Sequence, residues 1–184
     1  MRKQPEVTER TKARLREAFW RLYVEKPLER ISIKEITDAA GYNRGTFYLY
    51  YKDVHDMLAQ IEDDLLGMVE DLVRQRLIQD GKLRLEENME LILGLAQRYA
   101  DRFSVLLGDA GDPRFRARFK AIVAPLVETC VEPLPGTSPA EQALIAEFYL
   151  AGILAAVTAW LEDDGGVPID RLIDLIARQV FGRA

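Results

Sequence analysis

Residues 32–53 read SIKEITDAAGYNRGTFYLYYKD, and this stretch predicts two short helices joined by a tight turn. Ser32 and Glu35 have the spacing of a capping box, in which a hydroxyl and a carboxylate satisfy the free amides that open a helix. Gly41 is expected to end that helix, because glycine most easily adopts the left-handed conformation that follows a helix C-terminus. Two residues separate Gly41 from a second helical run, residues 44–51, so the pattern predicts a helix-turn-helix.

The second helical run has an inner and an outer side. Phe47 and Tyr51 are four residues apart and are expected to face inward. The outer side then presents Arg44, Gly45, Tyr48, Leu49 and Tyr50. A core helix would not normally expose so much aromatic surface, which indicates a binding surface.

Helical spacing of apolar residues continues on both sides of this stretch. Leu15, Ala18, Phe19, Leu22 and Tyr23 predict a first helix that ends before Pro27. Longer helices are predicted at residues 54–79, 85–107, 114–131, 138–161 and 169–181, and we find no alternation typical of strands. The predicted class is therefore all-α, with an N-terminal three-helix helix-turn-helix domain (residues 1–53) followed by a larger antiparallel helical bundle that dimerises (residues 54–184).

The charge of the chain is unevenly distributed. Residues 1–53 hold twelve Lys and Arg against eight Asp and Glu, whereas the remaining residues hold thirteen against twenty-two, for a net charge of −5. A basic segment attached to an acidic body favours a nucleic-acid partner at the N-terminal end.

Metal and catalytic chemistry find little support in the composition. Cys130 is the only cysteine and His55 the only histidine, which leaves too few ligands for a zinc site and fits a reducing cytoplasm. The consecutive carboxylates of residues 62–64 would point in different directions on a helix and are expected to be solvated. We identify no nucleophile with a base, so the sequence predicts no enzyme, no catalytic residue, no metal and no cofactor.

One apolar segment was tested as a membrane span. Residues 143–161 would reach about 28 Å as a helix, close to the thickness of a bilayer core. Glu147 interrupts this segment, and its small residues also suit close helix packing in water. We therefore expect no membrane insertion, and residues 1–6 lack the apolar core of a signal peptide.

The run from Ile33 to Asp53 resembles the DNA-binding signature of the TetR family of regulators, and residues 106–115 and 159–162 more faintly resemble one TetR-like C-terminal subgroup. This resemblance implies a homodimer that binds a palindromic operator in double-stranded DNA through paired recognition helices. It also implies a C-terminal bundle that dimerises and often binds an inducer.

The resemblance implies which residues lie at the DNA: Ser32, Lys34, Asn43, Arg44, Gly45, Tyr48, Leu49, Tyr50 and Lys52. Arg44 suits either a guanine edge or a phosphate, and Leu49 either a thymine methyl or its own domain. Val54 stands where many relatives carry a second lysine, so one phosphate contact is expected to be absent.

Two expectations concern the body of the chain. Residues 143–161 and 169–181 carry more apolar surface than a monomer could bury, which predicts that these two helices form the homodimer interface. Aromatic side chains could line a cavity for an apolar or aromatic effector, the alternative being an ordinary packed core. These side chains are Tyr99, Phe103, Phe119, Phe148, Tyr149 and Trp160.

The hypothesis that the sequence favours is a ligand-responsive repressor. A second hypothesis, supported by Val54 alone, is an accessory regulator that keeps the fold and acts mainly through a protein partner. A small helical enzyme is the third. Selection of duplexes from a random pool separates them, because only the repressor predicts enrichment of a palindrome.

Overall fold

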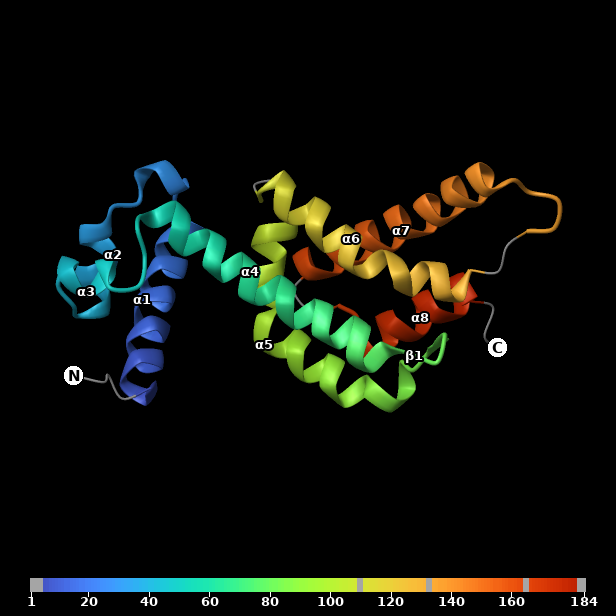
Figure 1. Cartoon of the computed structure of the whole chain (residues 1–184), viewed down its shortest axis with the longest axis horizontal. Coiled ribbons are helices and arrows are strands. Elements are labelled where there is room, and N and C mark those ends of the chain that lie inside the picture. The colour runs from blue at the N-terminus through green and yellow to red at the C-terminus, as the bar shows by residue number, and fades with distance from the viewer. Residues whose placement is uncertain (1–4, 109–110, 132–133, 164–165, 182–184) are drawn as a thin grey trace. The chain divides into compact units, whose positions relative to one another are not determined.

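The computed structural model describes residues 5–108, 111–131, 134–163 and 166–181, and helices form most of this part of the chain. The chain divides into two compact units, Met1–Leu65 and Leu66–Ala184. Their elements are coloured in chain order in Figure 1.

Unit 1 contains α1 (Pro5–Glu25), the 3₁₀ turn η1 (Leu28–Arg30), α2 (Ile33–Ala40), α3 (Arg44–Tyr48) and the start of α4 (Val54–Leu72). Helix α2 packs against both α1 and α3. The core side chains are less than 1% exposed and come from all four helices: Leu15, Phe19, Ile36, Phe47 and Met57. This arrangement confirms the predicted helix-turn-helix.

The unit boundary lies twelve residues beyond the boundary expected from the sequence, Asp53 against Leu65. The reason is that the first turns of α4 belong to the core of unit 1. Val54, Leu58 and Ile61 are buried there, and Asp64 forms an ion pair with Arg16 of α1.

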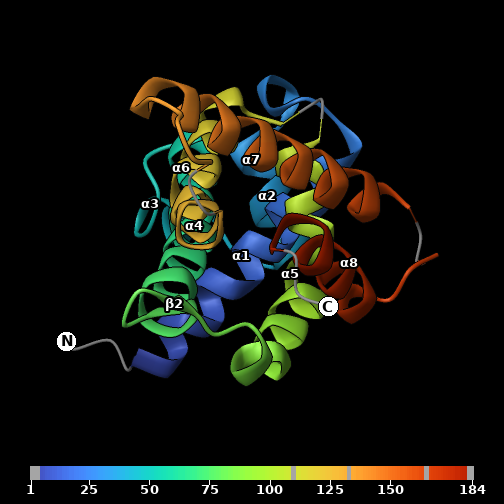
Figure 2. The same cartoon turned by 90° about the vertical axis from the view of Figure 1, so that its right-hand side faces the viewer.

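Unit 2 contains the end of α4, a π-helical turn η2 (Val73–Leu77), and strands β1 (Ile78–Gln79) and β2 (Lys82–Leu83). It continues with the 3₁₀ turn η3 (Glu86–Asn88), α5 (Met89–Leu107), α6 (Pro113–Cys130), α7 (Pro139–Glu162) and α8 (Ile169–Phe181). Helix α5 packs against α6, α7 and α8, and α6 packs against α7. Figure 2 shows α7 and α8 with α5 in this bundle.

Local capping chemistry explains several helix ends. The capping boxes of Ser32 with Glu35 and of Ser138 with Glu141 are both formed, and Asp112 accepts a hydrogen bond from the backbone amide of Arg114. Gly41 ends α2 with a φ of 75°, in the left-handed region. The start of α2 at Ser32 and its end at Gly41 were predicted, because each depends on residues close in sequence.

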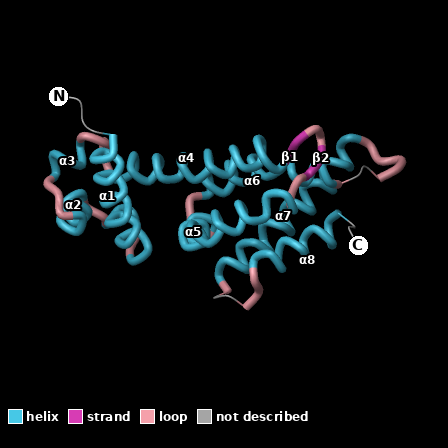
Figure 3. The backbone as a smooth tube through the Cα atoms, turned by 90° about the horizontal axis from the view of Figure 1, so that it is seen from below, coloured by secondary structure: helices cyan, strands magenta, loops and turns pink. Residues whose placement is uncertain are grey.

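The helix predicted from residue 54 to about residue 79 changes character near its end, because α4 gives way after Leu72 to the π-helical turn η2, and a β-hairpin begins directly after Leu77. Asp80 and Gly81 have φ values of 51° and 68°, as a tight two-residue hairpin turn requires. The antiparallel strands pair Ile78 with Leu83 and Gln79 with Lys82. They are drawn in magenta in Figure 3.

The second helix of the helix-turn-helix is also shorter than predicted. It ends at Tyr48 rather than Tyr51, because the amides of Tyr50 and Tyr51 both donate to the carbonyl of Phe47. Tyr51 nevertheless turns inward as predicted and is 2% exposed.

Among the described residues, α7 is the one helix long and apolar enough to cross a membrane by length and composition. A core helix of a bundle passes the same test, and α7 packs against α5 and α6. However, only 6% of the most apolar 18-residue stretch of α7 is buried, so most of its apolar side chains retain exposed surface.

Candidate nucleic-acid interface and apolar cavity

The turn between α2 and α3 is held by two short-range hydrogen bonds. The amide of Tyr42 donates to the carbonyl of Thr37 at 2.8 Å, which closes the end of α2. One residue later, the Asn43 carbonyl oxygen Oδ1 accepts from the Thr46 amide at 2.9 Å and caps α3. The start of α3 is therefore set rigidly relative to α2.

The outer side of α3 and of the residues after it is exposed. Tyr48 is 59% and Leu49 is 62% exposed, and Arg44 is exposed at the first position of α3. On the inner side, the rings of Phe47 and Tyr51 pack at a centroid distance of 5.4 Å. The outward side chains thus stand on a buried aromatic support.

A polar network holds that support to two other helices of unit 1. Arg16 Nε of α1 donates to the Tyr51 hydroxyl at 3.0 Å, and the same guanidinium forms an ion pair with Asp64 of α4 at 2.6 Å. Burial raises the pKa of the Tyr51 hydroxyl, so it stays protonated at neutral pH. No signal in the sequence indicated that Arg16, Tyr51 and Asp64 would be in contact, because Arg16 and Asp64 are 48 residues apart.

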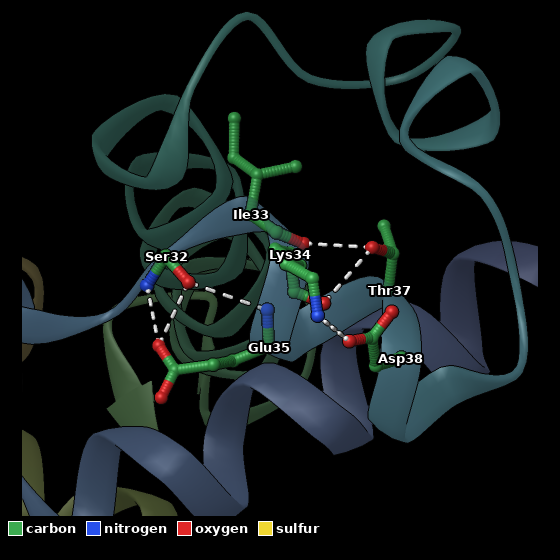
Figure 4. A network of polar contacts seen from close by, with 6 residues as sticks. All are labelled: Ser32, Ile33, Lys34, Glu35, Thr37 and Asp38. Atoms are coloured by element: carbon green, nitrogen blue, oxygen red, sulfur yellow. Dashed lines mark hydrogen bonds and ion pairs between the residues drawn. The ribbon is translucent and has the colours of Figure 1, made fainter.

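Helix α2 carries a second polar network, shown in Figure 4. The Ser32 hydroxyl and amide both donate to Glu35 Oε2, at 2.8 and 3.0 Å. Glu35 Oε1 lies 2.6 Å from the ammonium group of Lys26, and the hydrogen bonds from Lys26 and Ser32 lower the pKa of Glu35 to about 2. Glu35 is therefore ionised throughout the neutral range.

Lys34 has an intramolecular partner on the same helix. Its ammonium group lies 2.6 Å from Asp38 Oδ2 one turn along α2, and both side chains are more than half exposed (Figure 4). An exposed pair of this kind is weak, so it can be exchanged for a phosphate. Sequence reasoning named Lys34 but missed Asp38, although the spacing of four residues is a usable signal.

The structure brings all nine sequence-predicted DNA residues into unit 1, on three consecutive segments. Ser32 and Lys34 lie at the start of α2, and Lys52 is exposed just before α4. The others lie on the turn, on α3 or directly after it: Asn43, Arg44, Gly45, Tyr48, Leu49 and Tyr50. Tyr50 is half-buried rather than fully outward, and Gln60 donates to its carbonyl at 3.3 Å.

Val54 is 8% exposed and opens α4 as a core residue. The preceding Asp53 caps this helix by accepting a hydrogen bond from the Asp56 amide at 2.8 Å. His55 is exposed. Among the described residues, no group of three or more His, Cys, Asp or Glu side chains could hold a metal ion.

Unit 2 contains an apolar cavity of about 200 Å³ between its helices, and this cavity is partly open to solvent. Helices α4 to α8 all contribute to its walls. The lining residues are Met68, Val69, Leu72, Ile92, Leu95, Ala96, Ala100, Phe103, Leu107, Phe119, Val157, Trp160, Leu161 and Ile169. Phe103, Phe119 and Trp160 were predicted from the sequence.

The other three predicted pocket residues do not line this cavity. Phe148 is 74% exposed, the ring of Tyr99 lies beneath the guanidinium groups of Arg98 and Arg102, and Tyr149 is half-buried. Helical spacing allowed several faces for these rings, and only tertiary packing selects among them. The aliphatic lining residues gave no signal in the sequence.

A helix-turn-helix with an exposed outer side, followed by a helical bundle, is the architecture of one class of transcriptional regulator. Two family models match the chain. The model for bacterial regulatory proteins of the tetR family matches residues 15–61, and the model for a transcriptional regulator C-terminal region matches residues 84–182. The chain belongs to the TetR family.

Individual relatives are distant. The uncharacterized HTH-type transcriptional regulator YxbF of Bacillus subtilis is 22% identical over 162 residues, which cover 86% of this chain. The chain spans 41% of the length of that relative.

Two solved structures have a similar fold. One is a TetR transcriptional regulator from Streptococcus agalactiae 2603V, with a TM-score of 0.68, 20% identity and 96% of each chain covered. The other is the fatty acid degradation regulator FadR from Bacillus halodurans, with a TM-score of 0.63 and 15% identity, covering 99% of this chain and 97% of that chain. At this identity the likeness is one of fold.

Proposed function

We propose that the protein is a ligand-responsive repressor that acts in the cytoplasm and binds a palindromic operator as a homodimer. The observation that carries this proposal is the exposed outer side of α3 and of the residue after it, where Arg44, Tyr48 and Leu49 lie over the buried rings of Phe47 and Tyr51. A rigid support limits the side-chain and backbone ordering that DNA binding would otherwise require.

The chemistry of this face suits both kinds of DNA contact. Arg44 at the start of α3 can place two parallel hydrogen bonds on a guanine edge, and the exposed Leu49 can contact a thymine methyl. Tyr48 and Lys52 have donors that suit phosphate oxygens. Lys34 can also bind a phosphate oxygen when the phosphate replaces Asp38 as its partner.

Dimerisation is proposed through α7 and α8. Leu144 and Phe148 of α7 are 70% and 74% exposed, and Leu175 of α8 is 45% exposed. Further along α7, Gly152, Ala155 and Ala159 are also exposed, and small side chains allow a second helix to approach closely. A second copy of α7 and α8 would cover this apolar surface and complete a four-helix interface.

Ligand response is proposed through the cavity of unit 2. Met68, Val69 and Leu72 of α4 line the cavity, and Asp64 of the same helix holds Arg16 and, through it, Tyr51. A ligand that prefers one position of α4 would therefore change the stability of the DNA-binding arrangement.

Selection from a random duplex pool with the full chain tests this function. We expect enrichment of a short sequence with two-fold symmetry. Loss of the enrichment in the Arg44→Ala, Tyr48→Ala double variant would attribute it to α3, and a folded control with Ala117→Ser on α6 should select the same sequence. If the wild-type protein enriches no sequence, the alternative of an accessory regulator that acts through a protein partner is favoured.

A further inference from the structure

The cavity of unit 2 has almost no polar atom to offer a ligand. None of the described residues that line it carries a charge, and Trp160 is the one with a hydrogen-bonding side-chain group. The indole N–H of Trp160 already donates to the carbonyl of Val167 at 2.6 Å. The indole is thus held with its ring against the cavity and its donor occupied.

A cavity with an apolar wall of this kind is expected to prefer neutral ligands to charged ones. An ionised group that leaves water for such a cavity loses its hydration and finds no partner of opposite charge. The backbone of the lining helices exposes almost no polar atom to the cavity either. A neutral molecule meets no such penalty and gains from leaving water.

The size and the aromatic wall narrow the class of ligand further. The cavity volume of about 200 Å³ compares with the ~150 Å³ of an engineered apolar cavity that binds benzene. Phe103 and Phe119 lie with their ring centroids 5.6 Å apart at an angle of 56°, and Trp160 adds a third ring. Tilted rings at this spacing suit edge-to-face contact with another aromatic ring.

We propose that the cavity binds a compact, uncharged molecule of one aromatic ring with short alkyl groups, and binds carboxylates and cations of the same shape much more weakly. This inference rests on the proposed function only in taking the cavity as the effector site. A second hollow of unit 2, about 310 Å³, lies at the end of α6 and the start of α7 and includes Glu128 and Gln142. A cation would find a partner of opposite charge there instead, in Glu128.

Three probes of matched shape test the proposal by calorimetric titration of the full chain at neutral pH: p-cymene, 4-methylbenzoate and 4-methylbenzamidinium. We expect p-cymene to bind at least about a hundredfold more tightly than either ion. Ala96→Leu on the cavity wall should abolish p-cymene binding, and Ala100→Leu provides an independent second variant. Ala117→Leu, at an exposed position of α6, is the matched control and should bind as the wild type does.

The outcomes separate the ligand class from the proposed function. Three results would overturn the ligand class. 4-Methylbenzoate could bind as tightly as p-cymene, or p-cymene could fail to bind. Binding of p-cymene could also survive in both Ala96→Leu and Ala100→Leu while these variants are folded. Selective binding of p-cymene that leaves operator affinity unchanged would support the ligand class and contradict the proposed ligand response. Circular dichroism of each variant establishes that it is folded.

Discussion

Arg44 and Lys52 lie at opposite ends of the segment 44–52, which comprises α3 and the residues after it, and we expect them to make different contacts with DNA. Both are exposed, but Arg44 opens α3, whereas Lys52 follows it on the way to α4. In helix-turn-helix proteins the first residues of the recognition helix lie nearest the base edges. Residues beyond it lie closer to the phosphates.

Substituting these two residues should therefore have distinguishable effects. Arg44→Ala should cost roughly 1 to 3 kcal/mol per half-site and relax the preference at one symmetric position of the operator. Lys52→Ala should weaken specific and random DNA alike and reduce the log-log salt slope by about one per lost contact. Affinities measured across a salt series would contradict this division if Arg44→Ala left the sequence preference intact while Lys52→Ala shifted it.

Asp38 is expected to restrain DNA binding, because it forms an ion pair with Lys34 and adds a negative charge beside the proposed DNA-binding residues. Asp38→Asn should raise affinity for specific and random duplexes by a similar factor, about twofold per half-site, since exposed pairs of this spacing contribute about 0.3–0.5 kcal/mol. Glu25→Gln, an exposed carboxylate at the end of α1, is the control for loss of charge. A fall in affinity of Asp38→Asn would mean instead that Asp38 positions Lys34 for the phosphate.

The capping box of α2 should give a pH dependence with a defined sign. The folded-state pKa of Glu35 is about 2, below the ordinary value of 4.5, so unfolding takes up a proton between these values. Stability from this carboxylate is complete above about pH 4.5 and is lost as the pH falls towards 2. Thermal unfolding of the wild type and of Glu35→Gln should differ most at neutral pH and converge near pH 2. A constant difference would contradict the assignment.

Among whole elements, those whose ends depend on neighbouring residues were predictable from the sequence. Ser32, Asp112 and Ser138 each cap a helix within three residues, and the three helices begin within one residue of the positions expected from the sequence. The hairpin after η2 was missed, because Leu77 follows Val73 at helical spacing and the signal for a turn lies in Asp80 and Gly81 alone.

The candidate sites show the same division. The residues proposed to face DNA occupy one short stretch with a recognisable pattern, whereas the cavity joins side chains from five helices. Trp160 could be named from its size, but its bond to Val167 depends on the path of the chain between α7 and α8. Lining residues such as Ala96 and Ala100 have no chemistry that distinguishes them from ordinary core residues.

The exposed apolar face of α7 leads to a prediction about the helix as a unit. Phe148→Glu should dissociate the proposed dimer at micromolar concentration, because a charge would be buried without a partner in the interface. Since Phe148 is exposed within one chain, the variant should keep its helical circular dichroism. Sedimentation measures the change, with Ala117→Glu on α6 as the control. A Phe148→Glu dimer as tight as the wild type would place the interface elsewhere.

On the scale of the whole molecule, the charge distribution and the two-fold symmetry of the proposed dimer both favour binding of DNA at the helix-turn-helix. The segment of net positive charge is the one that carries the helix-turn-helix, and the acidic remainder would be repelled by the phosphates. In the proposed dimer, two recognition helices would enter successive major grooves on one face of the duplex, with half-sites about 34 Å apart or somewhat more.

The affinity of the dimer for its selected operator, compared with the same operator carrying about five extra base pairs between the half-sites, tests this central claim most directly. The insertion rotates one half-site by about half a turn to the opposite face of the duplex. We predict that affinity falls to the level of a duplex with a single half-site. Unchanged affinity would contradict the account, because it would show that the half-sites are not read by two recognition helices held together in one dimer.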